Sequence, residues 1–142
     1  ENVTDILLKR PLNQAGKRLA RAQLVAVRTS SNDSLQIGKV QWAAVSGNRD
    51  TLLAGVHILP GPPEAASLHT HGVGSIKAQH CRGFMLPLIE GLGETASVLT
   101  PPAWFQPGHV VEVTTEYGNR TIRLTSRIES GTDYDRCTFE VI

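Results

Sequence analysis

No stretch of this sequence keeps a helical repeat of apolar residues for three turns, whereas short strand-like segments recur along the whole chain. Residues 13–27 come closest to a helical pattern, with only Ala15, Leu19, Ala22 and Ala26 at the required spacing. About nine segments are instead short, partly alternating, rich in β-branched residues and bounded by turn-forming residues. The sequence therefore predicts an all-β fold, a barrel or a sandwich, for its 142 residues.

The clearest local pattern is a hairpin over residues 39–59. Two apolar arms of similar length flank a polar loop at residues 46–50. Gly38 and Gly55 lie within or beside the arms, and a glycine in a strand is typical of a bulge, a barrel corner or a close backbone approach. Strict alternation places Trp42 on the same face as Val40 and Gly38, where it would pack in the core.

The second half of the chain begins with a less regular segment. After Pro63 the strand pattern loosens for roughly fifteen residues, so we expect residues 63–79 to form a loop or linker. Strand-like segments resume at residue 80 and continue to the end of the chain. Alternation on both sides of residues 116–119 predicts a second antiparallel hairpin there.

Composition argues against several classes of protein. Fourteen basic and thirteen acidic side chains give a net charge of +1, which is too balanced to favour nucleic acid as a partner. No apolar run approaches the roughly 18 residues of a spanning helix, so no membrane insertion is expected. Cys81 and Cys137 have no disulfide-framework or zinc-knuckle spacing, which favours a reducing, cytoplasmic location.

Positive charge is concentrated at the N-terminal end of the chain. Residues 1–28 hold six basic side chains and two acidic ones, Glu1 and Asp5. Two interpretations stay open: the basic group faces a phosphate-bearing ligand, or it is a solvated surface. Binding of single-stranded nucleic acid favours aromatic residues interleaved with basic ones. No aromatic residue is interleaved with these charges. The basic residues are Lys9, Arg10, Lys17, Arg18, Arg21 and Arg28.

The hairpin carries a family resemblance. Its arms read IGKVQW at residues 37–42 and LAGVHIL at residues 53–59, and they resemble the later strands of PilZ-type domains. These domains are small six-stranded β-barrels that serve bacteria as receptors for cyclic di-GMP. The likeness covers residues 2–60, and residues 96–140 look like the C-terminal half of a less studied branch of PilZ-like proteins.

The resemblance implies a particular organisation of the chain. Residues 1–62 would form a PilZ-like antiparallel β-barrel, truncated at its N-terminus, followed by the linker at residues 63–79. Residues 80–142 would form a C-terminal β extension or second small β domain packed on the barrel. The segment upstream of Glu1 is not identified by this sequence.

The resemblance also implies a ligand site. Nucleotide-binding PilZ domains use an RxxxR stretch and a motif of the form (Asp/Asn)-x-Ser-x-x-Gly. Asn2 and Thr4 match hydrogen-bonding positions of the second motif, but Leu7 replaces its glycine and the arginine stretch would precede Glu1. With the basic residues, this gives a predicted ligand-binding set of Asn2, Thr4, Lys9, Arg10 and Arg28, for which cyclic di-GMP is the ligand and no other cofactor is needed.

A rival alignment fits the family less well. Lys17, Arg18 and Arg21 would imitate the arginine stretch, and Asn32 with Ser34 the second motif, but their separation is short and Gly38 falls one place late. Either alignment leaves the signature incomplete. The sequence thus favours a bacterial signalling or adaptor module, a degenerate or partial cyclic di-GMP receptor that acts through contacts with an unknown protein partner.

A different function is suggested by the histidines of the less regular segment. His69 and His71 would share one face of a strand, with His80 close behind in sequence, and imidazoles are ligands that zinc or copper prefers. The alternative hypothesis is therefore a small metal-binding or enzymatic β-barrel. Its spacing matches no standard zinc motif, and no nucleophile elbow or P-loop occurs, so we expect no enzyme.

Overall fold

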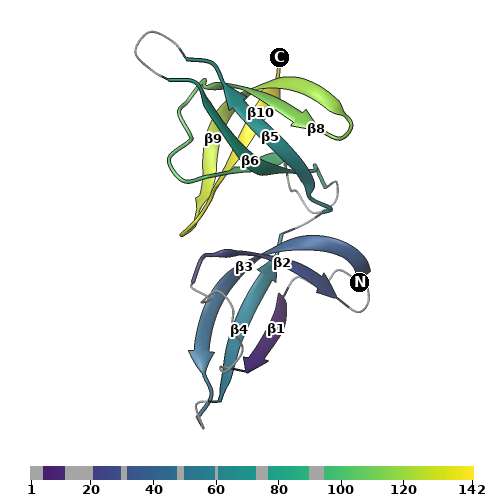
Figure 1. Ribbon diagram of the computed structural model, residues 1–142, viewed down its shortest axis with the longest axis vertical. Coiled ribbons are helices and arrows are strands. Elements are labelled where there is room, and N and C mark those ends of the chain that lie inside the picture. The colour runs from purple at the N-terminus through teal and green to yellow at the C-terminus, as the bar shows by residue number, and fades with distance from the viewer. Residues whose placement is uncertain are drawn as a thin grey trace. The chain divides into compact units, whose positions relative to one another are not determined.

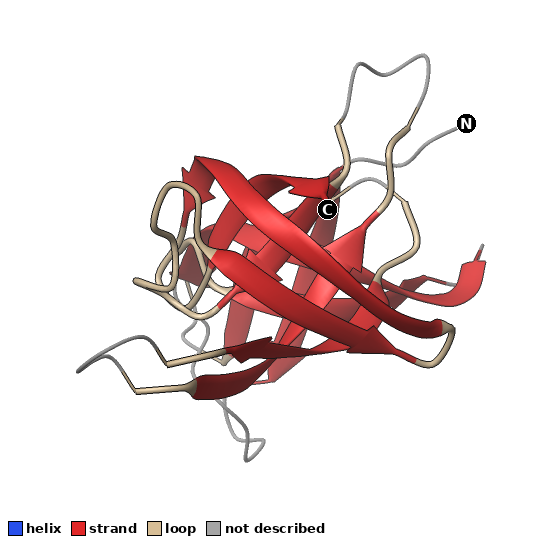
Figure 2. Ribbon diagram, turned by 90° about the horizontal axis from the view of Figure 1, so that it is seen from above, coloured by secondary structure: helices blue, strands red, loops and turns tan. Residues whose placement is uncertain are grey.

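The computed structural model describes residues 5–11, 21–29, 32–47, 50–59, 61–72, 77–89 and 95–142, and contains strands and no helix in these ranges (Figure 2). No helix that could span a membrane occurs in this part of the chain. The all-β prediction is confirmed. The strands are β1 (Asp5–Pro11), β2 (Leu24–Thr29), β3 (Asn32–Val45), β4 (Thr51–Ile58), β5 (Glu64–Thr70), β6 (Gln79–Leu86), β7 (Ser97–Thr100), β8 (Val110–Thr115), β9 (Gly118–Ser130) and β10 (Asp135–Val141).

The chain divides into two compact units between Pro60 and Gly61, with Gly131–Asp133 grouped with the first. The first unit is an open antiparallel sheet in the order β1-β4-β3-β2 (Figure 1). Its β3–β4 pairing confirms the hairpin predicted over residues 39–59. One face of this sheet carries the unit's buried cluster of Val27, Val40, Ala54, Val56 and Ile58.

The second unit is a closed barrel of six strands in the order β10-β7-β6-β5-β8-β9 (Figure 1). Pairing of β9 with β10 closes it, and register shifts on both sides of residues 137–138 bend the pair, as β-bulges do. In β6, a side chain at Gly83 would collide with the carbonyl oxygen of Leu99 and with Leu68. The barrel interior is apolar, formed by Ala66, Leu68, Met85, Val98, Val111, Val113, Ile122, Leu124 and Cys137.

The closed barrel lies in a different part of the chain from the one expected. We predicted it for residues 1–62, with an extension at residues 80–142, but the strands that close begin at Glu64 and end at Val141. Within the described residues of the first unit, β1 and β2 are the two edges of the sheet and do not pair with each other. Strand number and the pairing of the last strand to the first decide closure, and neither is visible in local alternation.

The predicted linker also contains a strand. Residues 64–70 form β5, which pairs with β6 on one side and β8 on the other. Ala66, Leu68 and Thr70 point into the barrel and are at most 6% exposed. Small and polar residues make up most of this strand, so its period-two pattern has little hydrophobic contrast.

A buried polar group joins β10 to its neighbours. Asp135 is 1% exposed, and its carboxylate accepts hydrogen bonds from the Ala103 backbone N–H (3.0 Å) and the Ser130 hydroxyl (2.8 Å). Arg136, 7% exposed, donates from Nε to Ser97 Oγ at 2.9 Å. These bonds satisfy polar groups that would otherwise be costly to bury.

Candidate functional site

The predicted ligand-binding residues do not converge in the structure. Asn2 and Thr4 lie outside the described residues. Lys9 and Arg10 are neighbours on β1 and therefore point to opposite faces of the sheet. Lys9 is exposed, whereas Arg10 is half-buried on the face that carries the core. Arg28 is exposed on β2, the opposite edge strand.

Trp42 lies on the face opposite to the one that alternation predicts. The β3–β4 register shifts between Val40 and Trp42, so that Val40 pairs with Val56 but Trp42 pairs with Gly55. This β-bulge turns Trp42 away from the buried face of Val40, and its side chain is 46% exposed. The prediction that Trp42 shares the face of Val40 and Gly38 is therefore wrong.

Gly55 explains how the indole is accommodated. The ring lies over Gly55, where any Cβ would collide with Nε1, Cε2 and Cδ1 of Trp42. On the other side of β4, Gly55 pairs with Leu7 of β1, which is 56% exposed. Trp42, Gly55 and Leu7 thus form one row across three strands.

Charged residues flank this row. On one side, the next outward-facing row contains Lys9, paired with Leu53 of β4. On the other side, Lys39 pairs with His57, and His57 Nδ1 lies 3.1 Å from Asp5 Oδ1. We call the surface of Leu7, Lys9, Lys39, Trp42 and His57 the Trp42 face. It combines an exposed aromatic ring with two lysines, which suits a planar anionic ligand, and the Asp5 carboxylate lies at its border beside His57.

The barrel carries a second group of functional side chains, on its outer surface. Strand pairing aligns His80 of β6, His69 of β5 and Glu112 of β8 in a single row. The ring centroid of His69 lies 4.9 Å from that of His71 and 6.2 Å from that of His80. His71 Nε2 lies 3.1 Å from Glu112 Oε1. We call His69, His71, His80 and Glu112 the histidine cluster.

These side chains do not converge on one point as they stand. No group of three His, Cys, Asp or Glu side chains in the described ranges is arranged to hold a metal ion. The sequence hypothesis named the three histidines, and the structure does bring them together. It missed Glu112, more than thirty residues further along the chain, which only the β5–β8 pairing reveals.

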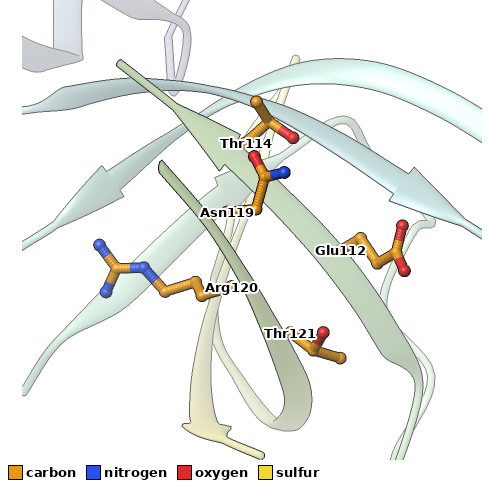
Figure 3. A pocket seen from close by; sticks show the side chains of 5 residues that line it. All are labelled: Glu112, Thr114, Asn119, Arg120 and Thr121. Atoms are coloured by element: carbon orange, nitrogen blue, oxygen red, sulfur yellow. The ribbon is translucent and has the colours of Figure 1, made fainter. Parts of the chain in front are cut away.

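Glu112 also borders a polar pocket of about 180 Å³ on the β8–β9 hairpin (Figure 3). Thr114, Asn119 and Thr121 line the pocket with it, and so does Arg120, whose side chain extends in a different direction. Arg120 Nη2 lies 3.9 Å from Glu64 Oε1. All five residues that line the pocket are polar, and they include one acidic and one basic side chain.

Three side chains of the barrel, Glu112, Cys81 and Cys137, have shifted pKa values. A hydrogen bond and the charge interaction with His71 lower the pKa of Glu112 below its ordinary value. Burial raises the pKa of the Cys81 thiol to about 11, and burial with the nearby Asp135 charge raises that of Cys137 to about 11. A thiol of this kind is a poor nucleophile at neutral pH.

Comparison with known proteins identifies the barrel. The family model described as the FimW C-terminal beta-barrel domain matches residues 66–142. No curated protein and no solved structure matched the chain. The match begins in β5, includes the strands of the closed barrel from there to the end, and covers more than half of the chain. The chain therefore belongs to the family of proteins that carry the FimW C-terminal beta-barrel domain.

Proposed function

We propose that this chain is a bacterial cytoplasmic signalling or adaptor module of PilZ-like type, and that it binds cyclic di-GMP on the Trp42 face. One observation carries the proposal: the indole of Trp42, 46% exposed, lies over Gly55 between rows that hold Lys9 and Lys39. We propose no catalytic activity and no resident cofactor for the chain.

The chemistry of the ligand suits this surface. Cyclic di-GMP has two guanine bases and two negatively charged phosphodiesters. A base that stacks on an aromatic side chain gains about 1–3 kcal/mol. Lysine ammonium groups on either side of the stacked base would attract the phosphates as point charges.

The same geometry explains why the receptor would be a degenerate one. Arg10 points away from the Trp42 face, and Arg28 lies on the far edge strand, so neither guanidinium of the predicted set flanks the indole. Lysines do not offer the bidentate fork with which arginine holds phosphate and guanine. Leu7, also exposed, gives the face apolar surface for a protein partner to contact together with the ligand.

Calorimetric titration of the chain with cyclic di-GMP tests the proposal. We expect saturable binding that Trp42→Ala weakens about tenfold, because the stacking platform is lost. Tyr117→Ala is the matched control, since Tyr117 is a 79% exposed aromatic residue on the β8–β9 turn of the other unit.

A second pair of variants tests the charge contribution. Lys9→Ala should weaken binding and reduce its salt dependence, whereas Lys77→Ala, an exposed lysine in the second unit, should not. Absence of binding to the unmodified chain would overturn the proposal. Equal affinity of the Trp42→Ala and unmodified proteins would remove the ligand from the Trp42 face.

A further inference from the structure

We propose that the histidine cluster on the barrel binds a divalent transition-metal ion through His69, His71 and Glu112, with His80 as a fourth ligand. The inference is independent of cyclic di-GMP binding, because it concerns only the second unit. Imidazole and carboxylate together suit zinc, and imidazole also suits copper and nickel. Zn²⁺ is the probe for the experiments below.

The rings lie close to the separation that a shared ion requires. A zinc–nitrogen bond of about 2.1 Å puts two imidazole centroids roughly 5 Å apart in a tetrahedral site. The observed centroid separations are 4.9 Å for His69 with His71 and 6.2 Å for His69 with His80. A shared ion would require side-chain rotations that turn one nitrogen of each ring toward it.

The contact between His71 and Glu112 already brings two candidate ligands together. Nε2 and Oε1 are 3.1 Å apart, and the side chains are 66% and 50% exposed. Both can reorient without disturbing the core. On binding, the ion would take the place of this direct contact, with Nε2 and Oε1 both as ligand atoms.

The backbone beneath the cluster is held by the closed barrel. His69 stands between Leu68 and Thr70, which point inward and are 0% and 3% exposed. Its cross-strand partners are His80 on one side and Glu112 on the other. Cys81 is not a candidate ligand, since it follows His80 on β6 and packs against the interior cluster.

An ordinary surface pair is the competing explanation. An exposed His–Glu contact by itself contributes little to stability and binds no ion. His57 and Asp5 provide an internal comparison, since they also make a histidine–carboxylate contact at 3.1 Å, through Nδ1 of the imidazole. The histidine cluster differs from this pair in function only if several of its side chains bind the same ion.

Calorimetry with Zn²⁺ on the full chain is the test. We expect one equivalent to bind at neutral pH. His69→Ala and Glu112→Gln should each weaken binding at least about tenfold. His57→Ala should leave both the affinity and the stoichiometry unchanged.

An NMR measurement on the unmodified protein tests the site without variants that could misfold. In the unmodified protein, one equivalent of Zn²⁺ should shift the imidazole proton NMR signals of His69 and His71 and leave those of His57 in place. Absence of stoichiometric binding overturns the inference. So do equal losses of affinity in His57→Ala and His69→Ala, or shifts spread evenly over all histidines.

Discussion

The indole of Trp42 on β3 lies directly over Gly55 on β4, in space that a side chain at position 55 would fill. The pair depends on the bulge between Val40 and Trp42, which turns the indole outward. Glycine at position 55 is thus a packing requirement of the first unit. It also leaves room for the exposed ring on the Trp42 face.

Gly55→Ala should therefore destabilise the first unit. The added methyl group must displace the indole, and overpacking of this kind costs about 1–3 kcal/mol. Chemical denaturation followed by tryptophan fluorescence measures the change. Gly47→Ala is the control, because nothing lies within 4 Å of a Cβ there, and it should change the free energy of unfolding by less than about 0.5 kcal/mol. Equal effects of the two substitutions would contradict the packing argument.

Removal of the buried Asp135 carboxylate should destabilise the barrel. Asp135→Ala leaves the Ala103 N–H and the Ser130 hydroxyl without their acceptor, at an expected cost of about 3 kcal/mol in the free energy of unfolding. Asp135→Asn keeps an acceptor and should cost less. The comparison is Glu140→Ala, whose exposed contact with Arg123 at 2.9 Å should contribute less than about 1 kcal/mol. Similar losses for Asp135→Ala and Glu140→Ala would rule out the burial effect.

The two cysteines should react slowly in the folded protein. A pKa of about 11 for Cys81 and for Cys137 leaves roughly a hundredfold less thiolate at pH 8 than an ordinary thiol with a pKa of 9.0. Alkylation followed by mass spectrometry should show slow modification that becomes fast in denaturant. Rapid labelling of Cys137 in the folded state would show that this thiol is not buried as described.

The same thiols make folding sensitive to alkaline pH. Because their pKa is higher in the folded state than in the unfolded chain, their contribution to stability is complete below about pH 9 and is lost as the pH rises toward 11. The free energy of unfolding should fall over this range. In a Cys137→Ala variant, the decline with pH should be shallower than in the unmodified protein.

Glu112 should titrate at a higher pH when its histidine partner is removed. The hydrogen bond and charge of His71 hold the pKa of this carboxyl below its usual value, so His71→Ala should raise it. The contribution of Glu112 to stability is present above its unfolded pKa and is lost as the pH falls through the folded one. Carbon NMR of the carboxyl group measures the titration, and added salt should shrink the shift. His57→Ala, which acts on the other unit, should leave the Glu112 titration unchanged.

Much of the architecture could be predicted because strands and tight turns leave a local signal. The β3–β4 hairpin and the β8–β9 hairpin both follow from apolar arms around short polar turns. β5 was missed because Ala65, Ser67 and His69 alternate with inward residues that include the small Ala66 and the polar Thr70. Hydrophobic contrast fails as a signal where the inward residues are small or polar.

The sites were less accessible to prediction from the sequence. Charge and nearness in sequence group Lys9 with Arg28, yet the two residues lie on opposite edge strands of one sheet. Strict alternation predicts the wrong face for Trp42 because a bulge adds a residue and inverts the alternation beyond it. Glu112 joined His69 and His71 only through a strand pairing that links distant parts of the chain.

By itself, the sequence determined the all-β class and the hairpins, because side chains alternate with period two and turn residues act over a few positions. Tertiary structure decided which strands close into a barrel, which face Trp42 occupies and which residues meet Glu112. These outcomes depend on register between segments far apart in the chain, and a shift of one residue moves every side chain of a strand to its other face.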